Sequence, residues 1–73
     1  LMTKIGLFDS GVGGLTVLKE LIASIPHASY VYFGDTARFP YGGKSQDTII
    51  RYSLENSAFL IDQGVELIAV ACH

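Results

Sequence analysis

Six residues with chemically useful side chains stand at the ends of three short apolar runs. They bring together carboxylates, hydroxyls, a thiol and an imidazole: Asp9, Ser10, Asp35, Thr36, Cys72 and His73. A thiol carries little thiolate at neutral pH, but nearby cations or a helix N-terminus raise that fraction. A thiolate can act as a nucleophile or as a base that removes a proton. The pattern therefore indicates thiol chemistry, provided that the fold brings the three ends together.

The three apolar runs, residues 4–8, 29–33 and 66–71, are short and rich in β-branched or aromatic residues. Apolar residues at successive positions are typical of strands buried on both faces of a parallel sheet. Parallel strands place their carboxyl ends on one edge, where open α/β sheets bind ligands. We therefore expect the six side chains to gather around one crevice at that edge.

Two helices are expected between these strands. The first carries apolar residues at helical spacing from Leu15 to Ile25, and Pro26 ends it. The second covers residues 45–63, with Ser45 in its first turn and Gly64 just beyond its end. Its apolar side chains form one stripe, and four further apolar residues widen that stripe. We therefore expect other parts of the protein to pack against this helix on more than one side. The stripe is Ile50, Leu54, Ala58 and Ile61, and the widening residues are Ile49, Tyr52, Phe59 and Leu60.

The order of the elements is therefore β-α-β-α-β. This alternation predicts the α/β class, with a parallel sheet and right-handed crossovers, as in part of a doubly wound fold. Three strands with two helices leave apolar surface bare, whereas parallel sheets normally have both faces covered. We therefore expect residues 1–73 to form an incomplete domain, either as part of a longer protein or in need of a partner.

The segment from Asp9 to Gly14 joins the first strand to the first helix and contains three glycines. Glycines let the backbone turn tightly and approach a ligand, and a helix N-terminus suits a carboxylate or phosphate. The alternative is a plain strand-to-helix turn in which Asp9 or Ser10 caps the helix. The segment matches neither the G-x-G-x-x-G dinucleotide pattern nor a P-loop, which makes a phosphate- or nucleotide-binding module a distant alternative.

Cys72 and the loop around Tyr41 are the remaining candidates for the site. A lone cysteine in an apolar run is often a small buried hydrophobe, but Cys72 stands at the end of its run. The adjacent His73 points to the opposite face of a strand, so Asp9 is the better candidate to orient or tune the thiol. The loop over residues 37–45 contains Tyr41 and two glycines. Its backbone N–H groups and the Tyr41 ring can hold a small substrate.

The composition of the chain argues against some classes of binding partner and indicates a cellular compartment. The chain has 73 residues, a net charge of -2 and only five Lys plus Arg, which argues against nucleic acid and against an anionic membrane surface. No apolar run approaches the roughly 20 residues of a bilayer span, and no signal peptide is apparent. A single cysteine excludes an internal disulfide and fits a reducing compartment, so we expect a cytoplasmic protein.

Three motifs, "IGLFDSGVGGLTVLKEL", "YFGDTARFPYGGKS" and "GVELIAVAC", together resemble the N-terminal part of the glutamate racemases, within the aspartate/glutamate racemase superfamily. The resemblance implies racemisation by two cysteine bases, without a cofactor or metal. It implies that Cys72 is the first catalytic cysteine and that Asp9 assists it. It also implies that Asp9 and Ser10 bind the substrate, glutamate, together with the loop backbone at Tyr41 and Gly42.

The same resemblance limits what residues 1–73 can do alone. They correspond to the N-terminal portion of the first racemase domain, and the second cysteine belongs to a later part. Because racemisation needs a proton donor on the second face, we expect this chain alone to be inactive. The resemblance also implies that the whole enzyme supplies D-glutamate for peptidoglycan. His73 departs from the asparagine that is usual in the family.

Several alternatives stay open at this stage. One is a sibling enzyme that uses the same thiol, namely an aspartate or hydantoin racemase or a decarboxylase. Another is a non-catalytic α/β fragment that binds carboxylates weakly through the turn at Asp9 to Gly14. A homo-oligomer is also open, because nothing in the sequence decides the number of subunits.

Overall fold

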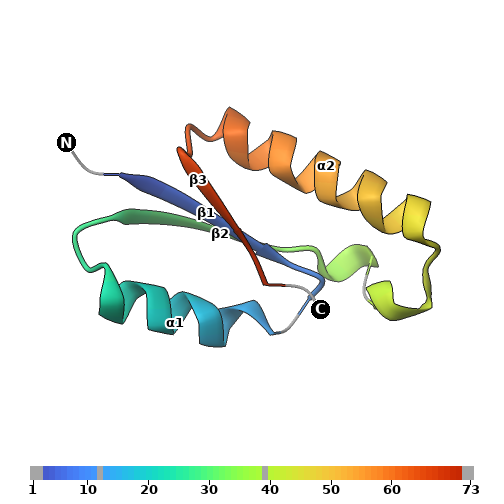
Figure 1. Ribbon diagram of the computed structural model, residues 1–73, viewed down its shortest axis with the longest axis horizontal. Coiled ribbons are helices and arrows are strands. Elements are labelled where there is room, and N and C mark those ends of the chain that lie inside the picture. Colours follow the sequence, from blue (N-terminus) through green and yellow to red (C-terminus); the bar gives the residue numbers. More distant parts are fainter. Residues whose placement is uncertain (1–2, 12, 39, 72–73) are drawn as a thin grey trace.

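The computed structural model describes residues 3–11, 13–38 and 40–71 of the chain (Figure 1). Strands and helices alternate as the sequence predicts, and two short 3₁₀ turns, η1 and η2, lie between the second strand and the second helix. The elements are β1 (Lys4–Asp9), α1 (Gly14–Ser24), β2 (Ser29–Gly34), η1 (Thr36–Arg38), η2 (Tyr41–Gly43), α2 (Gln46–Asp62) and β3 (Leu67–Val70). In the part of the chain just given, no helix is long and apolar enough to cross a membrane.

The three strands form one parallel sheet in the order β2-β1-β3. Asp9 pairs with Gly34 at the end of β1, and Phe8 pairs with Val70 of β3. Figure 1 shows α1 on one side of the sheet and α2 on the other. The connection through α1 runs from β1 to β2 and the connection through α2 runs back to β3, so right-handed crossovers place the two helices on opposite faces. The predicted α/β class and doubly wound parallel arrangement are therefore confirmed.

The core lies around the central strand β1 and the C-terminal half of α2. Leu7, Phe8 and Leu60 are fully buried, and Ile5 is nearly so. Gly6 packs tightly here, because a Cβ at this position would lie 3.0 Å from Val65 Cγ1, and the Val65 side chain would have to shift. The strand thus brings its backbone against the turn that follows α2, which fixes how that helix lies on the sheet.

The helix α2 is bounded as the sequence predicts. The Ser45 side chain accepts a hydrogen bond of 3.2 Å from the Thr48 N–H, and Gly64 beyond the last turn has a φ of +86°. A serine cap satisfies one of the free N–H groups of the first turn, and a left-handed glycine ends the helix without steric cost. Both signals are local, so they could be recognised without knowing the tertiary fold.

The face of α2 that packs on the sheet differs from the expected one. The expected stripe is exposed: Ile50 (49%), Leu54 (66%), Ala58 and Ile61 (62%). The buried face instead contains Asn56 and Leu60, with Ile49 and Tyr52 half-buried beside them. The expectation of cover on more than one side is therefore wrong for the described residues. The helix is apolar on two sides, but only one of them packs, and a polar residue occupies the middle of that side.

Apolar surface stays bare on the other elements as well. On α1, Leu15, Ile22 and Ile25 are 44–54% exposed, and on the edge strand β3 Leu67 and Val70 are each 58% exposed. The expectation of strands buried on both faces therefore holds for β1 and is wrong for β3, since no described element covers it. The expectation of bare apolar surface is confirmed.

Candidate functional site at the carboxyl edge of the sheet

The tips of the three strands meet at one edge, as predicted. The Asp35 N–H, one residue beyond β2, donates a hydrogen bond of 3.0 Å to the Asp9 carbonyl. On the other side, the Ala71 N–H donates to the Phe8 carbonyl at 2.9 Å, so the chain leaves β3 beside the end of β1. The predicted site residues Cys72 and His73 follow directly and lie outside the described residues.

The strand order makes this edge a favourable place for a ligand. The chain passes from β1 to β2 on one side and then returns across the sheet to β3 on the other. Connections that leave in opposite directions create a crevice outside the strand ends, where doubly wound folds bind their ligands. In this sheet the point where the connections diverge lies between the tips of β1 and β3, next to Asp9 and Ala71.

The Asp9 carboxylate is the most buried charged group at this edge, with a relative exposure of 1%. Its Oδ1 accepts from the Gly11 N–H at 2.8 Å. Its Oδ2 accepts from the Tyr32 hydroxyl at 2.7 Å and from the Gly14 N–H at the start of α1. The positive end of the helix and three donors thus compensate the burial of this charge.

Asp9 therefore acts as a cap for α1, which is the structural alternative that the sequence offered. The carboxylate satisfies the first backbone N–H of the helix from outside it. Ser10 follows at the tip of β1 and is half-buried. Capping is compatible with a second role in the site, and the roles of Asp9 and Ser10 in substrate binding stay predictions.

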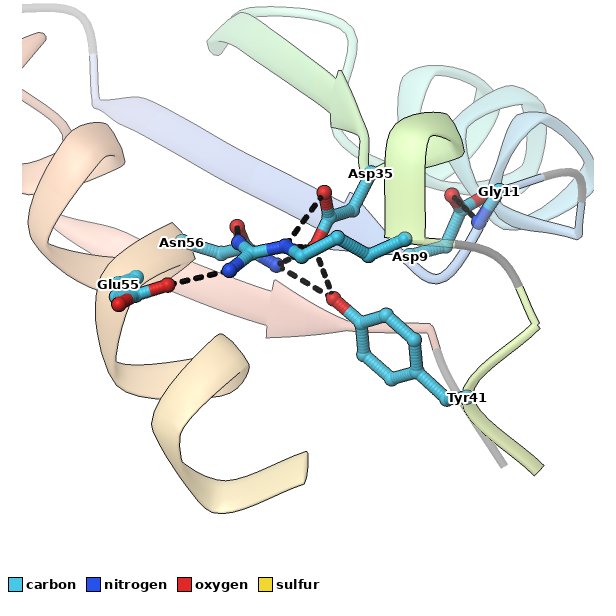
Figure 2. A network of polar contacts seen from close by, with 7 residues as sticks. Asp9, Gly11, Asp35, Tyr41, Glu55 and Asn56 are labelled. Atoms are coloured by element: carbon cyan, nitrogen blue, oxygen red, sulfur yellow. Dashed lines mark hydrogen bonds and ion pairs between the residues drawn. The ribbon is translucent and has the colours of Figure 1, made fainter. Parts of the chain in front are cut away.

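A second polar cluster surrounds the Asp35 carboxylate, which is 4% exposed (Figure 2). Arg38 Nε donates to both of its oxygens, at 3.2 and 2.9 Å. The Tyr41 hydroxyl donates to Oδ2, and Asn56 Nδ2 donates to the same oxygen at 3.0 Å. The cluster therefore joins the tip of β2, the two 3₁₀ turns and the middle of α2.

Arg38 extends this cluster along α2. Its Nη2 donates to Asn56 Oδ1 at 3.0 Å, and its Nη1 forms an ion pair with Glu55. The guanidinium carbon lies 4.0 Å from the centre of the Tyr52 ring, which adds a cation–π contact. Each nitrogen of the guanidinium group is thereby directed at α2 or at the tip of β2.

The cluster holds its groups in fixed protonation states. Burial favours the neutral form of Asp35, but hydrogen bonds from Tyr41, Arg38 and Asn56 outweigh it and hold the pKa of Asp35 below its ordinary value. Burial and the hydrogen bond to Asp35 raise the pKa of Tyr41. Contacts with Glu55 and Asp35 raise the pKa of Arg38. Near neutral pH the cluster therefore contains a carboxylate, a phenol and a guanidinium cation.

Tyr41 and Gly42 lie in η2, but their environments differ. Tyr41 is 6% exposed and its hydroxyl is engaged by Asp35 and Asn56, so the phenol is part of the cluster. Gly42 is exposed, and a Cβ built on it would meet nothing within 4 Å. Any contact of this turn with a substrate would therefore come from its backbone, which stays a prediction.

Sequence reasoning missed Tyr32, Arg38 and Asn56. Asn56 has a recognisable signal, because it stands at helical spacing between Tyr52 and Leu60, where an apolar residue is usual. Tyr32 and Arg38 have none, since their roles depend on contacts that only the fold creates. Among residues 3–11, 13–38 and 40–71, no group of three His, Cys, Asp or Glu side chains is placed to hold a metal ion.

In sequence and in fold, the chain is similar to glutamate racemases. The glutamate racemase of Geobacter metallireducens is 59% identical over 94% of this chain and 26% of its own length. The solved structure of glutamate racemase from Aquifex pyrophilus has a TM-score of 0.91 and 62% identity, over 93% of this chain and 27% of that one. The Francisella tularensis glutamate racemase, solved in complex with D-glutamate, has a TM-score of 0.89 and 50% identity, over 96% and 26%. No protein-family model matches the chain.

The chain thus spans only about a quarter of the length of the curated relatives that it matches. Within that quarter, however, the similarity extends over 93–96% of this chain. In sequence and in fold, the chain matches the N-terminal quarter of the glutamate racemases.

Proposed function

We propose that the protein that contains this chain is a glutamate racemase, which interconverts L- and D-glutamate without a cofactor. The observation that carries the proposal is the 62% identity at a TM-score of 0.91 to the Aquifex pyrophilus glutamate racemase, over 93% of this chain. Glutamate racemases from other organisms agree with this assignment.

In this proposal the Cys72 thiolate is the first base. It removes the α-proton of glutamate and leaves a carbanion, and a second thiol on the opposite face returns a proton to that carbon. The first thiolate becomes a thiol and the second thiol becomes a thiolate, so charge and protons balance. The second thiol comes from outside these 73 residues, since Cys72 is the single cysteine of the chain.

The buried Asp9 carboxylate orients and tunes Cys72 from the neighbouring strand tip. Its fixed position supports this role, because three donors hold both carboxylate oxygens. Asp9 and Ser10 form one wall of the substrate site, and the backbone of η2 at Tyr41 and Gly42 forms another. The exposure of Gly42 supports the second wall, since its backbone is open to a ligand.

We assign the product D-glutamate to the synthesis of peptidoglycan, and we place the enzyme in the cytoplasm. Both assignments rest on the similarity to glutamate racemases, and the second also on the single cysteine of the chain. An aspartate racemase is the alternative that must be distinguished, because a substrate shorter by one methylene presents the same groups at the α-carbon.

The test is a chimaeric racemase, in which this chain replaces the matching quarter of the Aquifex pyrophilus glutamate racemase. Circular dichroism follows the conversion of L-glutamate, with L-aspartate as the comparison substrate. We expect the chimaera to racemise glutamate and to lose more than about a thousandfold in kcat with Cys72→Ser, because a hydroxyl is a far weaker acid than a thiol. A Cys72→Ser chimaera with full activity would overturn the proposal. So would an unmodified chimaera that racemises L-aspartate faster than L-glutamate.

A further inference from the structure

Among the described residues of the η2 turn and its flanks, residues 40–45, one side chain is buried. Within residues 40–45, Tyr41 is buried and all the others are exposed. A Cβ on Gly42 or Gly43 would meet nothing within 4 Å, so the turn is open on the side where side chains would stand. The position of these two residues therefore depends on how firmly Tyr41 is held.

Two elements hold the Tyr41 hydroxyl. It donates to Asp35 Oδ2 at the tip of β2, and it accepts a hydrogen bond of 2.9 Å from Asn56 Nδ2 on α2. Donation and acceptance together fix the orientation of the hydroxyl group. Figure 2 shows the ring between the helix and the tip of β2, with its hydroxyl directed at Asp35 and Asn56.

Asn56 is the group that links these partners. It is 2% exposed, and both ends of its amide are hydrogen-bonded. Its Nδ2 donates to Asp35 at 3.0 Å as well as to Tyr41, and its Oδ1 accepts from Arg38 at 3.0 Å. The side chain at position 56 must therefore donate two hydrogen bonds and accept one. An amide can do this, whereas a carboxylate and an alkyl group cannot.

We propose that Asn56 is a positioning residue of the racemase site. Through its hydrogen bonds to Tyr41 and Asp35, Asn56 holds the η2 turn beside the tips of the strands. The inference rests on the proposed function in one respect, namely that the η2 backbone contacts the substrate. The position of Asp35 supports it, because the Asp35 N–H is bonded to the carbonyl of Asp9. The turn and the Asp9 wall of the site are thereby tied to the same two strand ends.

The test compares Asn56→Leu and Tyr41→Phe in the chimaeric racemase. We expect each to raise KM for glutamate about tenfold and to change kcat less than about twofold, because a displaced turn weakens binding and not proton transfer. Hydrogen exchange of the Lys44 amide, which donates to the Tyr41 carbonyl at 2.9 Å, should accelerate by a similar factor without substrate, because the loosened turn opens more often. The double variant should be no worse than Asn56→Leu alone, since both changes break one linkage.

Two control variants separate positioning from stability. Leu60→Val removes a methylene one turn along α2 and should lower Tm without changing KM, and Tyr52→Phe should change neither. If Asn56→Leu lowers Tm but leaves KM and the exchange of the Lys44 amide unchanged, the inference is wrong. It is also wrong if the effects of the two single variants multiply. If the unmodified chimaera does not racemise glutamate, the proposed function fails, and the exchange data still decide whether Asn56 holds the turn.

Discussion

Gly14 and Asp9 are in such close contact that no side chain fits between them. The Gly14 N–H donates to Asp9 Oδ2, and a Cβ on Gly14 would lie 2.9 Å from Asp9 Cγ and equally close to Tyr32 Cε1. Carbon atoms in real proteins do not approach to that distance. The glycine at the start of α1 is therefore required by the buried carboxylate.

The first prediction concerns this contact. Gly14→Ala should destabilise the chimaeric racemase by about 3 kcal/mol, because Asp9 must move away and lose part of its hydrogen bonding. Thermal unfolding measures this loss, and kcat should fall with it if Asp9 tunes the catalytic thiol.

The matched control is the neighbouring glycine. Gly13 has a right-handed helical conformation (φ -85°, ψ -18°), and a Cβ there would meet nothing within 4 Å. Gly13→Ala should therefore cost about 1 kcal/mol or less. Equal losses in the two variants would contradict the role given to the Asp9–Gly14 contact.

The second prediction concerns the Tyr32 hydroxyl, which donates to Asp9 Oδ2 at 2.7 Å. Tyr32→Phe keeps the ring and removes one of the three donors to the carboxylate. We expect a loss of about 1–2 kcal/mol in stability, since a hydrogen bond to a buried charge is stronger than a neutral one. In the chimaera we expect kcat to fall more than KM rises, because in the proposed function Asp9 tunes the thiol of Cys72.

Tyr52→Phe is the control for this substitution. The Tyr52 ring packs 5.4 Å from that of Tyr41 and lies under the Arg38 guanidinium, and phenylalanine keeps both of these ring contacts. The substitution should therefore leave stability and kcat unchanged. A Tyr32→Phe enzyme that resembles Tyr52→Phe in both measurements would show that the Tyr32 hydroxyl does not support Asp9.

The strands, the helices and their order could be predicted because their signals are local. Apolar runs, a serine cap, a proline stop and a glycine end are each contained in a few consecutive residues. Parallel pairing then follows from the alternation, and with it the meeting of Asp9 and Asp35 at one edge. The position of Asp9 at this edge could be predicted from the sequence for this reason.

The packed face of α2 and the anchor of the η2 turn could not be predicted. The helix has apolar residues on two sides, and the sheet selects the side that carries Asn56. The turn is fixed by hydrogen bonds between residues 15–21 positions apart, from Tyr41 and Asp35 to Asn56. Neither choice is encoded in local periodicity, because both depend on which elements face each other after folding.

The third prediction is a loss of stability in acid. The hydrogen bonds to Asp35 hold its pKa below the ordinary value of 3.8, so the folded state favours the carboxylate. The stabilisation is complete above pH 3.8, where both folded and unfolded forms are ionised, and it is lost as the pH falls through the lower pKa of the folded state. Unfolding midpoints measured from neutral pH down to about pH 2.5 should show this loss.

Asp35→Asn is the comparison for the acid prediction. It removes the titrating group and should lower Tm at neutral pH, and the difference from the unmodified chain should shrink below pH 3.8. A difference that stays constant across the whole acid range would mean that the charge of Asp35 does not stabilise the cluster.

The last prediction concerns the apolar face of α2 that points away from the sheet. Leu54 and Ile61 are 66% and 62% exposed on this face, whereas Leu60 on the opposite face is fully buried. Exposed apolar groups of this size favour association and bind hydrophobic dyes. We therefore expect the 73-residue chain alone to bind such a dye and to elute as an associated species in size-exclusion chromatography.

Paired lysine substitutions locate the source of this behaviour. Leu54→Lys with Ile61→Lys should reduce dye binding and association without lowering the unfolding midpoint, because these side chains contribute little to the packing on the sheet. Leu60→Lys should instead unfold the chain, because it buries a charge in the core. A chain that is monomeric and silent to the dye before any substitution would contradict the exposure of this face, and with it the placement of Asn56 on the side that packs.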